Sequence, residues 1–293
     1  MNSLQSWRLG DAVISKIPER ETSGVAASFL FPQWNSDRAM LAASALPPGC
    51  VDTDSESVAL STHSWLVQVE GQAILIDTAS GNDKERPLNP GFHRMNTRWL
   101  ENLHSAGVLP EAIDSVLLTH LHVDHVGWNT DKSSSSWTAT FPHARYYFSD
   151  AEYQFYRQPD NVQDPSAGVF EDSVQPIVDA GLDVRIGADF SALPAGFQLH
   201  RFPGHSHDHL GFSLTRGGET ALFWGDVLHS PLQVALPEWN SVFCEFPQQA
   251  LHSRQQALAL AEKQQALVFT THFPGSSAGR VVRHAEGLSW QAA

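Results

Sequence analysis

The chain has 293 residues, of which 42% are hydrophobic, so it can bury the core of an ordinary globular enzyme. Its formal net charge of −14 repels phosphate backbones and no local basic patch offsets it, which disfavours a nucleic-acid partner. The apolar runs are far shorter than the roughly 20 residues of a membrane-spanning helix, and the N-terminus lacks the basic and apolar regions of a secretory signal. We therefore expect a cytoplasmic protein without a membrane partner.

The first part of the chain combines one strand with an aromatic-rich segment. Apolar residues alternate loosely from Trp7 to Ile17, which predicts an opening strand that ends at Pro18. Residues 21–48 scatter aromatic side chains among Ser, Pro and Ala, and predict a loop with a short helix near 37–45. This segment could wall a pocket, lie at the subunit contact of a homodimer, or pack in the core.

Two strands, a helix and a third strand follow. Their expected ranges are Val58 to Val69 and Gln72 to Ile76, joined by a turn at Glu70-Gly71, then Asn96 to Ala106 and Ser115 to Thr119. Asp77 directly follows the second strand. It could cap a turn, but a carboxylate that orients a ligating histidine is the favoured role.

The third strand runs into the motif His120-Leu121-His122-Val123-Asp124-His125. Alternation directs His120 and His122 the same way, while Asp124 and His125 can turn toward a second ion. Four metal-grade ligands in six positions indicate half of a two-metal site.

The second half of the chain repeats the pattern of strands that end in ligand-type residues. After a polar tip at 131–136, the expected strands are 145–149, 197–202, 210–215, 220–224 and 266–270, and the expected helices are 151–156, 171–180 and 248–263. Three strand ends carry His205, Asp226 and His272. No repeat or linker divides the chain, so we expect a single domain over residues 1–293.

These residues complete a ligand set for two ions. His120, His122 and His205 would hold one ion, Asp124, His125 and His272 the other, and Asp226 would bridge them. Such a set leaves room for a shared water, as in catalytic rather than structural sites. The two cysteines, Cys50 and Cys244, cannot form a Cys-rich zinc site.

The motifs at His120 to His125, Gly204-His205, Gly225-Asp226 and His272 resemble those of the metallo-β-lactamase-fold hydrolases. Further phrases are similar to the methyl parathion hydrolase and acyl-homoserine-lactonase branch: Ile76-Asp77-Thr78, Gly81-Asn82-Asp83-Lys84, His125-Val126-Gly127-Trp128-Asn129, Phe170-Glu171-Asp172-Ser173 and His272-Phe273-Pro274. The resemblance runs from about Trp7 to the last strand. It implies an α/β (α+β) fold, a four-layer αββα sandwich with two mixed sheets and the metals at one edge.

The chain departs from the family pattern at two places. Where the family usually has proline and glycine after the third ligand, this chain has Ser206-His207-Asp208-His209. His207 and Asp208 could support the site, lie at the surface or compete with His205. Lactonases of the family commonly carry a tyrosine three residues after the bridging aspartate, where this chain has His229, a candidate proton donor or a packed residue.

We predict a dinuclear metal-dependent hydrolase in which a bridging hydroxide attacks a small-molecule carboxylic ester or lactone. Asp124 would position the nucleophile, and Trp128 and Phe273, which adjoin ligand loops, would contact the substrate or else pack in the core. Zinc is the expected metal, and manganese, iron or cobalt also suit these ligands.

Three alternatives keep the same ligands. The site would also suit a phosphotriester, in the manner of methyl parathion hydrolase. A thioesterase of the glyoxalase II kind is less favoured because no basic cluster would bind an anionic thiol carrier. The chain could also be a non-catalytic metal-binding protein.

Overall fold

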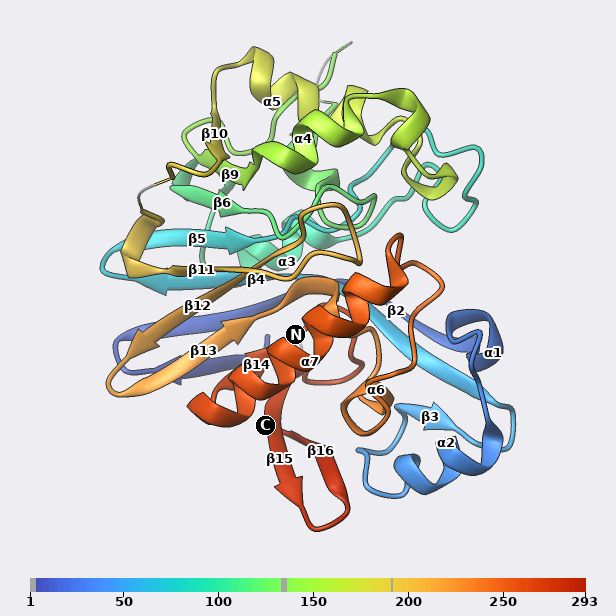
Figure 1. Cartoon of the computed structure of the whole chain (residues 1–293). Helices are drawn as coiled ribbons and strands as arrows, with labels where there is room; N and C mark the ends of the chain where they lie inside the picture. Colours follow the sequence, from blue (N-terminus) through green and yellow to red (C-terminus); the bar gives the residue numbers. More distant parts are fainter. Residues whose placement is uncertain (1–3, 133–135, 191) are drawn as a thin grey trace. The chain divides into compact units, whose positions relative to one another are not determined.

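The computed structural model describes residues 4–132, 136–190 and 192–293. It divides into two compact units, which are treated separately below (Figure 1). Unit 1 comprises Met1–Glu19 and Thr62–Gly196, and unit 2 comprises Arg20–Ser61 and Phe197–Ala293. The prediction of one domain remains a prediction.

An eight-stranded mixed sheet forms most of unit 1, and two of its strands, β2 and β4, continue into unit 2. The strand order is β1-β2-β4-β5-β6-β9-β10, with β3 beside β4. The bounds are β1 Ser6–Leu9, β2 Ala12–Ala26, β3 Val51–Asp52, β4 Ser57–Val69, β5 Gln72–Ile76, β6 Ser115–Leu117, β9 Arg145–Ser149 and β10 Asp183–Ile186. From β5 to β10 the neighbours are parallel, so the ends of β5, β6 and β9 lie at one edge.

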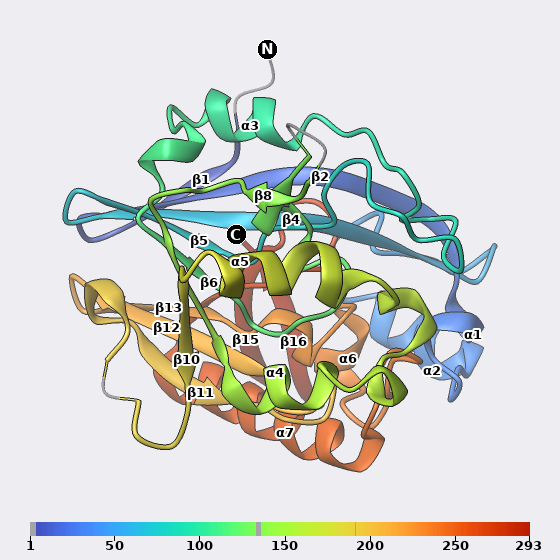
Figure 2. The same cartoon turned by 90° about the horizontal axis from the view of Figure 1, so that it is seen from above.

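Short helices cover the sheet of unit 1. They are α3 Trp99–Ser105, α4 Asp150–Tyr156 and α5 Gln175–Asp179, the last preceded by a π-helical turn, Phe170–Val174. Helix α3 lies along the sheet in Figure 2 and buries Trp99 and Leu103 in the same hydrophobic cluster as Leu75 and Val116. Strands β7 Thr130–Asp131 and β8 Thr138–Ala139 form a separate small sheet.

Unit 2 is built on a six-stranded sheet, in the order β11-β12-β13-β14-β15-β16. The bounds are β11 Gln198–Arg201, β12 Leu210–Arg216, β13 Glu219–Phe223, β14 Leu267–Phe269, β15 Ala278–His284 and β16 Gly287–Ala292. The neighbours are antiparallel except β13 and β14, which α7, Pro247–Gln264, joins as a crossover helix (Figure 1). Leu258 of α7 packs in one cluster with Leu222 and Val268 of this pair.

Three shorter helices complete unit 2: α1 Ala27–Leu30, α2 Ser36–Ala43 and α6 Leu232–Ala235. Asn35 caps α2 by accepting the backbone N–H of Arg38 at 3.0 Å, as asparagine commonly does at a helix N-terminus. Across all described residues, no helix is both long and apolar enough to cross a bilayer.

The predicted α/β class with two mixed sheets is confirmed. The hairpin around Glu70-Gly71, the strand at 145–149 and the helix near 37–45 are also confirmed, within one or two residues. The predicted polar tip at 131–136 lies partly outside the described residues.

The predicted end of the first strand at Pro18 is wrong. The segment forms two strands, β1 and β2, joined at Gly10, and β2 runs through Pro18 to Ala26. Strand β1 pairs only with residues 12–15, so the missing N–H of Pro18 interrupts no hydrogen bond between β1 and β2.

Two further expectations about strands also need correction. Strand β10 was not expected, and the strand at 266–270 is not the last, because β15 and β16 follow it as a hairpin. The sequence of β15 and β16 is mixed in polarity, and only four of its 13 positions are buried, which hides the alternation typical of a strand.

Candidate metal-binding site

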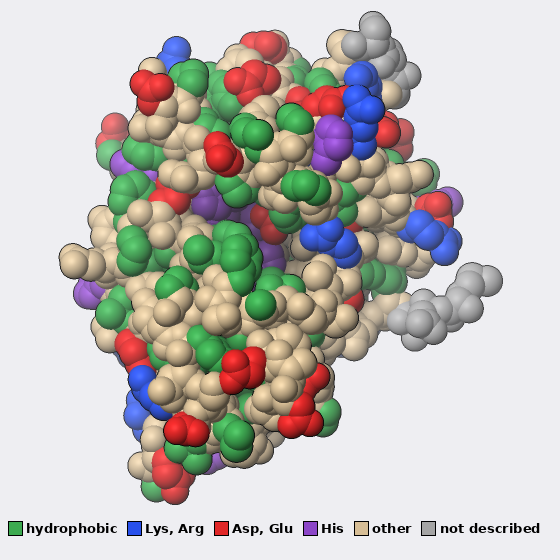
Figure 3. Space-filling view, turned by 90° about the vertical axis from the view of Figure 1, so that its right-hand side faces the viewer, with side chains coloured by type: hydrophobic (Ala, Val, Ile, Leu, Met, Phe, Trp, Pro, Cys, Tyr) green, Lys and Arg blue, Asp and Glu red, His purple; other side chains and the backbone are tan. Residues whose placement is uncertain are grey.

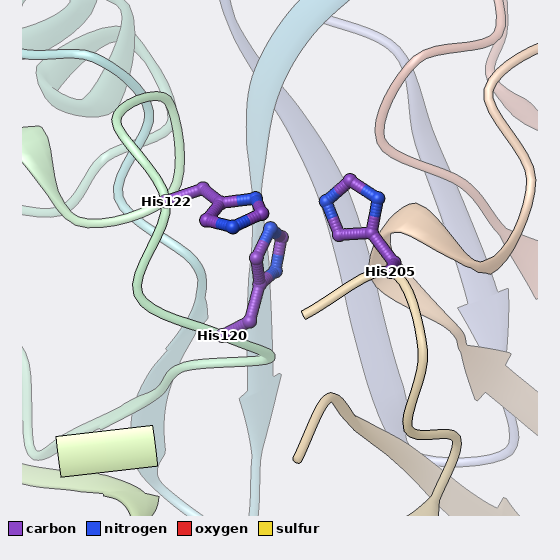
Figure 4. Close-up of side chains that lie close together, drawn as sticks. All are labelled: His120, His122 and His205. Carbon is purple, nitrogen blue, oxygen red and sulfur yellow. The ribbon is translucent and has the colours of Figure 1, made fainter. Parts of the chain in front are cut away.

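The loop that leaves β6 carries the four ligand candidates of unit 1. The ring centroids of His120 and His122 lie 4.6 Å apart, and the ring centroids of His120 and His125 lie 4.0 Å apart. Figure 4 shows the rings of His120 and His122 turned toward each other, and it also labels His205, which belongs to a loop of unit 2. Asp124 Oδ1 lies 3.6 Å from His125 Nε2. His120 and His125 are buried, whereas His122 and Asp124 are partly exposed.

A second loop fixes the backbone of this motif. The N–H of Thr78 donates to the carbonyl of His125 at 2.7 Å, and the N–H of Trp128 donates back to Thr78 at 2.9 Å. Gly127 passes so close that a Cβ there would lie 1.8 Å from the carbonyl oxygen of Ser80. Only glycine fits at this position, because the loops that follow β5 and β6 are packed backbone to backbone.

Asp77 orients His125 directly and His120 through Thr119. Its carboxylate accepts the N–H of Thr119 at 2.7 Å, the Thr119 hydroxyl at 2.8 Å and the Nδ1–H of His125 at 2.9 Å. Because the Thr119 hydroxyl donates to Asp77, its oxygen accepts from His120 Nδ1, 3.0 Å away. Both histidines therefore keep the Nε2 lone pair that a metal requires.

In unit 2, three imidazoles converge on one carboxylate oxygen. Oδ2 of Asp226 lies 2.9 Å from Nε2 of His272, 3.3 Å from Nε2 of His205 and 3.4 Å from Nε2 of His229. All four residues are buried. The ring of His229 stacks on that of His272 with centroids 5.2 Å apart.

The strand register of unit 2 produces this convergence. Phe223 of β13 is the parallel partner of Phe269 of β14, and Asp226 and His272 each follow three residues later. The N–H of Phe202 bonds to the carbonyl of His209 beside β11, and His205 follows Phe202 by three residues. Asp226 and His272 therefore leave adjacent parallel strands at matching heights, and His205 comes from the loop between β11 and β12.

The donor set of unit 2 fits a divalent cation. Nδ1 of His272 donates to the carbonyl of Ser61 at 2.9 Å, so its Nε2 presents a lone pair to the carboxylate. Two lone pairs 2.9 Å apart repel each other unless a proton or a cation lies between or beside them. Burial, partly offset by Asp226, lowers the pKa of His229, which favours the neutral form of that ring.

Comparison with known proteins identifies the family. The profile of the metallo-beta-lactamase superfamily matches residues 58–272. The chain belongs to this superfamily. A lactamase-like protein of Pestalotiopsis microspora is 28% identical over 172 residues, a match that covers 56% of this chain and 38% of that protein. The chain thus spans less than half of this relative.

Solved structures share the metallo-beta-lactamase fold over the full length of the chain. The hydrolase AbOPH of the beta lactamase superfamily has a TM-score of 0.79 and 22% identity, over 100% of this chain and 98% of that one. AidC, a dizinc quorum-quenching lactonase, has a TM-score of 0.78 and 20% identity, over 99% and 97%. A probable metal-dependent hydrolase from Staphylococcus aureus has a TM-score of 0.75 and 18% identity, over 98% and 99%.

The sequence analysis missed one residue of the metallo-beta-lactamase site, His209. This buried imidazole accepts the backbone N–H of Asp226 through its Nε2 at 3.0 Å and so holds the loop of the carboxylate. Its position directly before β12 could have identified it, because a side chain there can contact the end of the neighbouring strand β13. His207 is exposed, and Asp208 pairs with Arg201.

The two aromatic candidates for substrate contact are buried in hydrophobic clusters. Trp128 stacks on Trp99 with centroids 5.5 Å apart and donates its indole N–H to Glu19 at 2.8 Å. Phe273 packs edge-on against Trp290 at 4.9 Å. Core packing therefore accounts for both side chains, and their contact with a substrate remains a prediction.

Proposed function

We propose that this metallo-beta-lactamase superfamily member hydrolyses a small-molecule carboxylic ester or lactone with two divalent ions, zinc in the first place. The observation that carries the proposal is the buried Asp226 carboxylate with three Nε2 atoms within 3.4 Å of one oxygen. Membership of the superfamily supports the assignment as a metal-dependent hydrolase. The ester or lactone substrate and the identity of the metal are the proposed parts.

The proposed ligands are those that the motifs predict. His120, His122 and His205 would hold one ion, Asp124, His125 and His272 the second, and Asp226 both. The tautomers set by Thr119, Asp77 and Ser61 support this assignment, because each leaves the Nε2 atom of a ligand histidine available.

The bound ions would lower the pKa of coordinated water toward neutrality and polarise the substrate carbonyl. The chain supplies the rest of the chemistry. Asp77 and His209 hold His125 and the Asp226 loop in place, and Asp124 is proposed to orient the attacking oxygen. Because burial favours its neutral ring, His229 is proposed to donate an Nε2–H hydrogen bond to the leaving oxygen rather than to act as an imidazolium.

The preference for an ester or lactone is supported by similarity of fold and by charge. AidC, a lactonase, matches 99% of this chain. On the face shown in Figure 3, Lys and Arg side chains form small separate groups among Asp and Glu, which suits a neutral small molecule better than a polyanion. Cytoplasmic location, the absence of nucleic-acid or membrane partners and a homodimer remain predictions.

A substrate panel with metal analysis tests the proposal. Purified protein should contain about two divalent ions per chain, and it should hydrolyse a nitrophenyl ester or an acyl lactone faster than a neutral phosphotriester or a thioester. Chelation should abolish turnover without unfolding the chain, and added zinc should restore it. The proposal is refuted if the phosphotriester or thioester is the best substrate, or if the His122→Ala variant keeps full activity.

A further inference from the structure

Three of the exposed large apolar side chains of unit 2 come from two segments that are far apart in the sequence but lie together. Phe29 is 57% exposed, Val242 44% and Phe243 38%. The rings of Phe29 and Phe243 meet edge to face with centroids 6.0 Å apart. We call these three residues the apolar surface of unit 2.

Buried neighbours hold both segments in place, so the exposure is built into the fold. Leu30 and Phe31, directly after Phe29, are fully buried, and Phe31 packs on Trp239 at 5.7 Å. The N–H of Val242 donates to the carbonyl of Leu30 at 2.8 Å and ties the two segments together. Burying the exposed rings would require a partner or a ligand, since their own backbone is already fixed.

The apolar surface is continuous with the cluster around Asp226. The ring of Phe243 lies 5.9 Å from that of His229, whose Nε2 is 3.4 Å from Oδ2 of Asp226. The ring of Phe243 therefore contacts His229, the proposed partner of the leaving group, and is itself part of the solvent-exposed apolar surface. A substrate held at Asp226 would need little length to reach Phe243 and then Phe29.

We propose that the apolar surface formed by Phe29, Val242 and Phe243 binds the hydrocarbon chain of the substrate, so that the enzyme prefers medium-chain acyl esters or acyl lactones to short ones. The inference rests on the proposed ester hydrolysis and adds the class of substrate to it. All three side chains lack charge and hydrogen-bonding groups, so they can stabilise a bound substrate only through contacts with its apolar groups. Full burial of one methylene should raise kcat/KM about fourfold.

The test compares nitrophenyl acetate, hexanoate and decanoate on the wild type, Phe29→Ala, Phe243→Ala and Phe243→Leu. The decanoate-to-acetate ratio of kcat/KM should fall about tenfold in each alanine variant, as loss of a partly buried aromatic contact predicts. Phe243→Leu should recover part of the ratio. Leu41→Ala, which truncates an exposed side chain of α2 in the same unit, is the matched control and should leave the ratio unchanged.

A binding measurement separates this inference from the proposed function. Calorimetry with metal-free protein should show that decanamide binds at least about tenfold more tightly than acetamide, and that Phe243→Ala removes the difference. If the wild type hydrolyses esters but the ratios and the decanamide affinity do not change in the variants, the inference is wrong and the function stands. If no ester or lactone is hydrolysed, the function fails, and the decanamide result alone decides whether the surface binds hydrocarbon. A wild-type dimer that Phe29→Ala converts to monomer, with unchanged ratios, would show that a second copy covers the surface and would overturn the inference.

Discussion

The ligand candidates of unit 1 and unit 2 are held in opposite ways. In unit 1, His120, His122, Asp124 and His125 lie on one loop, and a neighbouring loop fixes that backbone. In unit 2, His205, Asp226 and His272 come from three strand ends and meet only because β11 to β14 are in register. The first set depends on local backbone contacts, whereas the second depends on the whole sheet.

The difference has a physical consequence for how each set tolerates change. A contiguous loop can lose a contact that supports its backbone and keep its ligands near one another, because the chain itself connects them. A ligand ring that loses its own orienting hydrogen bond is still expected to bind the ion more weakly. Dispersed ligands have no such connection, so the distances between them depend on the register of the strands that carry them. The predictions below test this contrast, beginning with the largest expected effect.

Asp226→Ala should have the largest effect, because it removes the oxygen on which three imidazoles of unit 2 converge. We expect more than about a 100-fold loss of kcat/KM, beyond the loss typical of residues that only orient a ligand, with loss of bound metal by elemental analysis. Asp208→Ala is the matched control, because that carboxylate pairs with Arg201 in the same unit. Retention of metal and activity by Asp226→Ala would mean that the convergence in unit 2 is not the metal site.

Asp77→Asn tests the support of the contiguous loop. The amide nearly keeps the shape of the carboxylate, but it cannot accept from His125, Thr119 N–H and the Thr119 hydroxyl with equal strength. We expect a 10- to 100-fold loss in metal affinity, measured by competition with a chromogenic chelator. Full affinity would show that the loop orients His125 without this carboxylate.

His209→Ala tests the corresponding support in unit 2. It leaves the backbone N–H of Asp226 without its acceptor and opens a buried cavity. We expect a loss of about 2 kcal/mol in the free energy of unfolding and about tenfold weaker metal binding, measured by urea titration and calorimetry. The exposed neighbour His207→Ala should change neither quantity, and equal effects of the two variants would contradict the role of His209.

Glu19→Gln should have a smaller effect, because Glu19 supports the loops of unit 1 and its hydrogen bonds to Ser80, Gly81 and Trp128 reach no ligand candidate. The partly buried carboxylate accepts the N–H groups of Ser80 and Gly81 and the indole N–H of Trp128, and so holds together the loops after β5 and β6. Glutamine can keep only some of these bonds, so we expect a loss of about 1–2 kcal/mol in the free energy of unfolding with little change in metal affinity. Glu111→Gln, at an exposed position, is the control. A tenfold loss of metal affinity would show that the loop tolerates less than the contrast predicts.

Lys84 lies further from the ligand loop of unit 1, and its contribution to the free energy of unfolding is expected to depend on pH. Its buried ammonium group donates to Thr130 at 2.6 Å and lies over the ring of Trp137, while Arg86 pairs with Asp172 through two bonds. Burial lowers the pKa of Lys84 to about 7 despite Asp172, whereas the unfolded chain should keep the value near 10.5. Between these values the unfolded state binds more protons, so the free energy of unfolding should rise with pH.

We expect the stability of the wild type relative to Lys84→Met to increase by about 1 kcal/mol per pH unit between pH 7.5 and 9.5. Urea titrations at several pH values measure this slope. Lys263→Met, which removes an exposed lysine from α7, should give no slope. If the stability difference between the wild type and Lys84→Met does not change with pH, Asp172, 3.8 Å from the Lys84 ammonium group, keeps Lys84 charged throughout this range.

The sequence alone indicated the α/β class, most strands and helices, and the family. It could do so because the motif of unit 1 is contiguous and because ligand-type residues directly follow apolar strands, so spacing along the chain carries the information. The same local patterns failed at Pro18, because a proline ends a strand only where its missing N–H would break a hydrogen bond to a neighbouring strand. They also failed at β15 and β16, where partial exposure hides the alternation.

Only the tertiary structure showed how the dispersed residues act on one another. It brought Nε2 of His205, His229 and His272 around one oxygen of Asp226, revealed His209 behind that carboxylate, and placed Trp128 and Phe273 in hydrophobic clusters. The physical reason is that strand register and helix packing set distances between residues that are far apart in the chain, and no local pattern encodes them. The same cause brings Phe29 beside Phe243, next to His229.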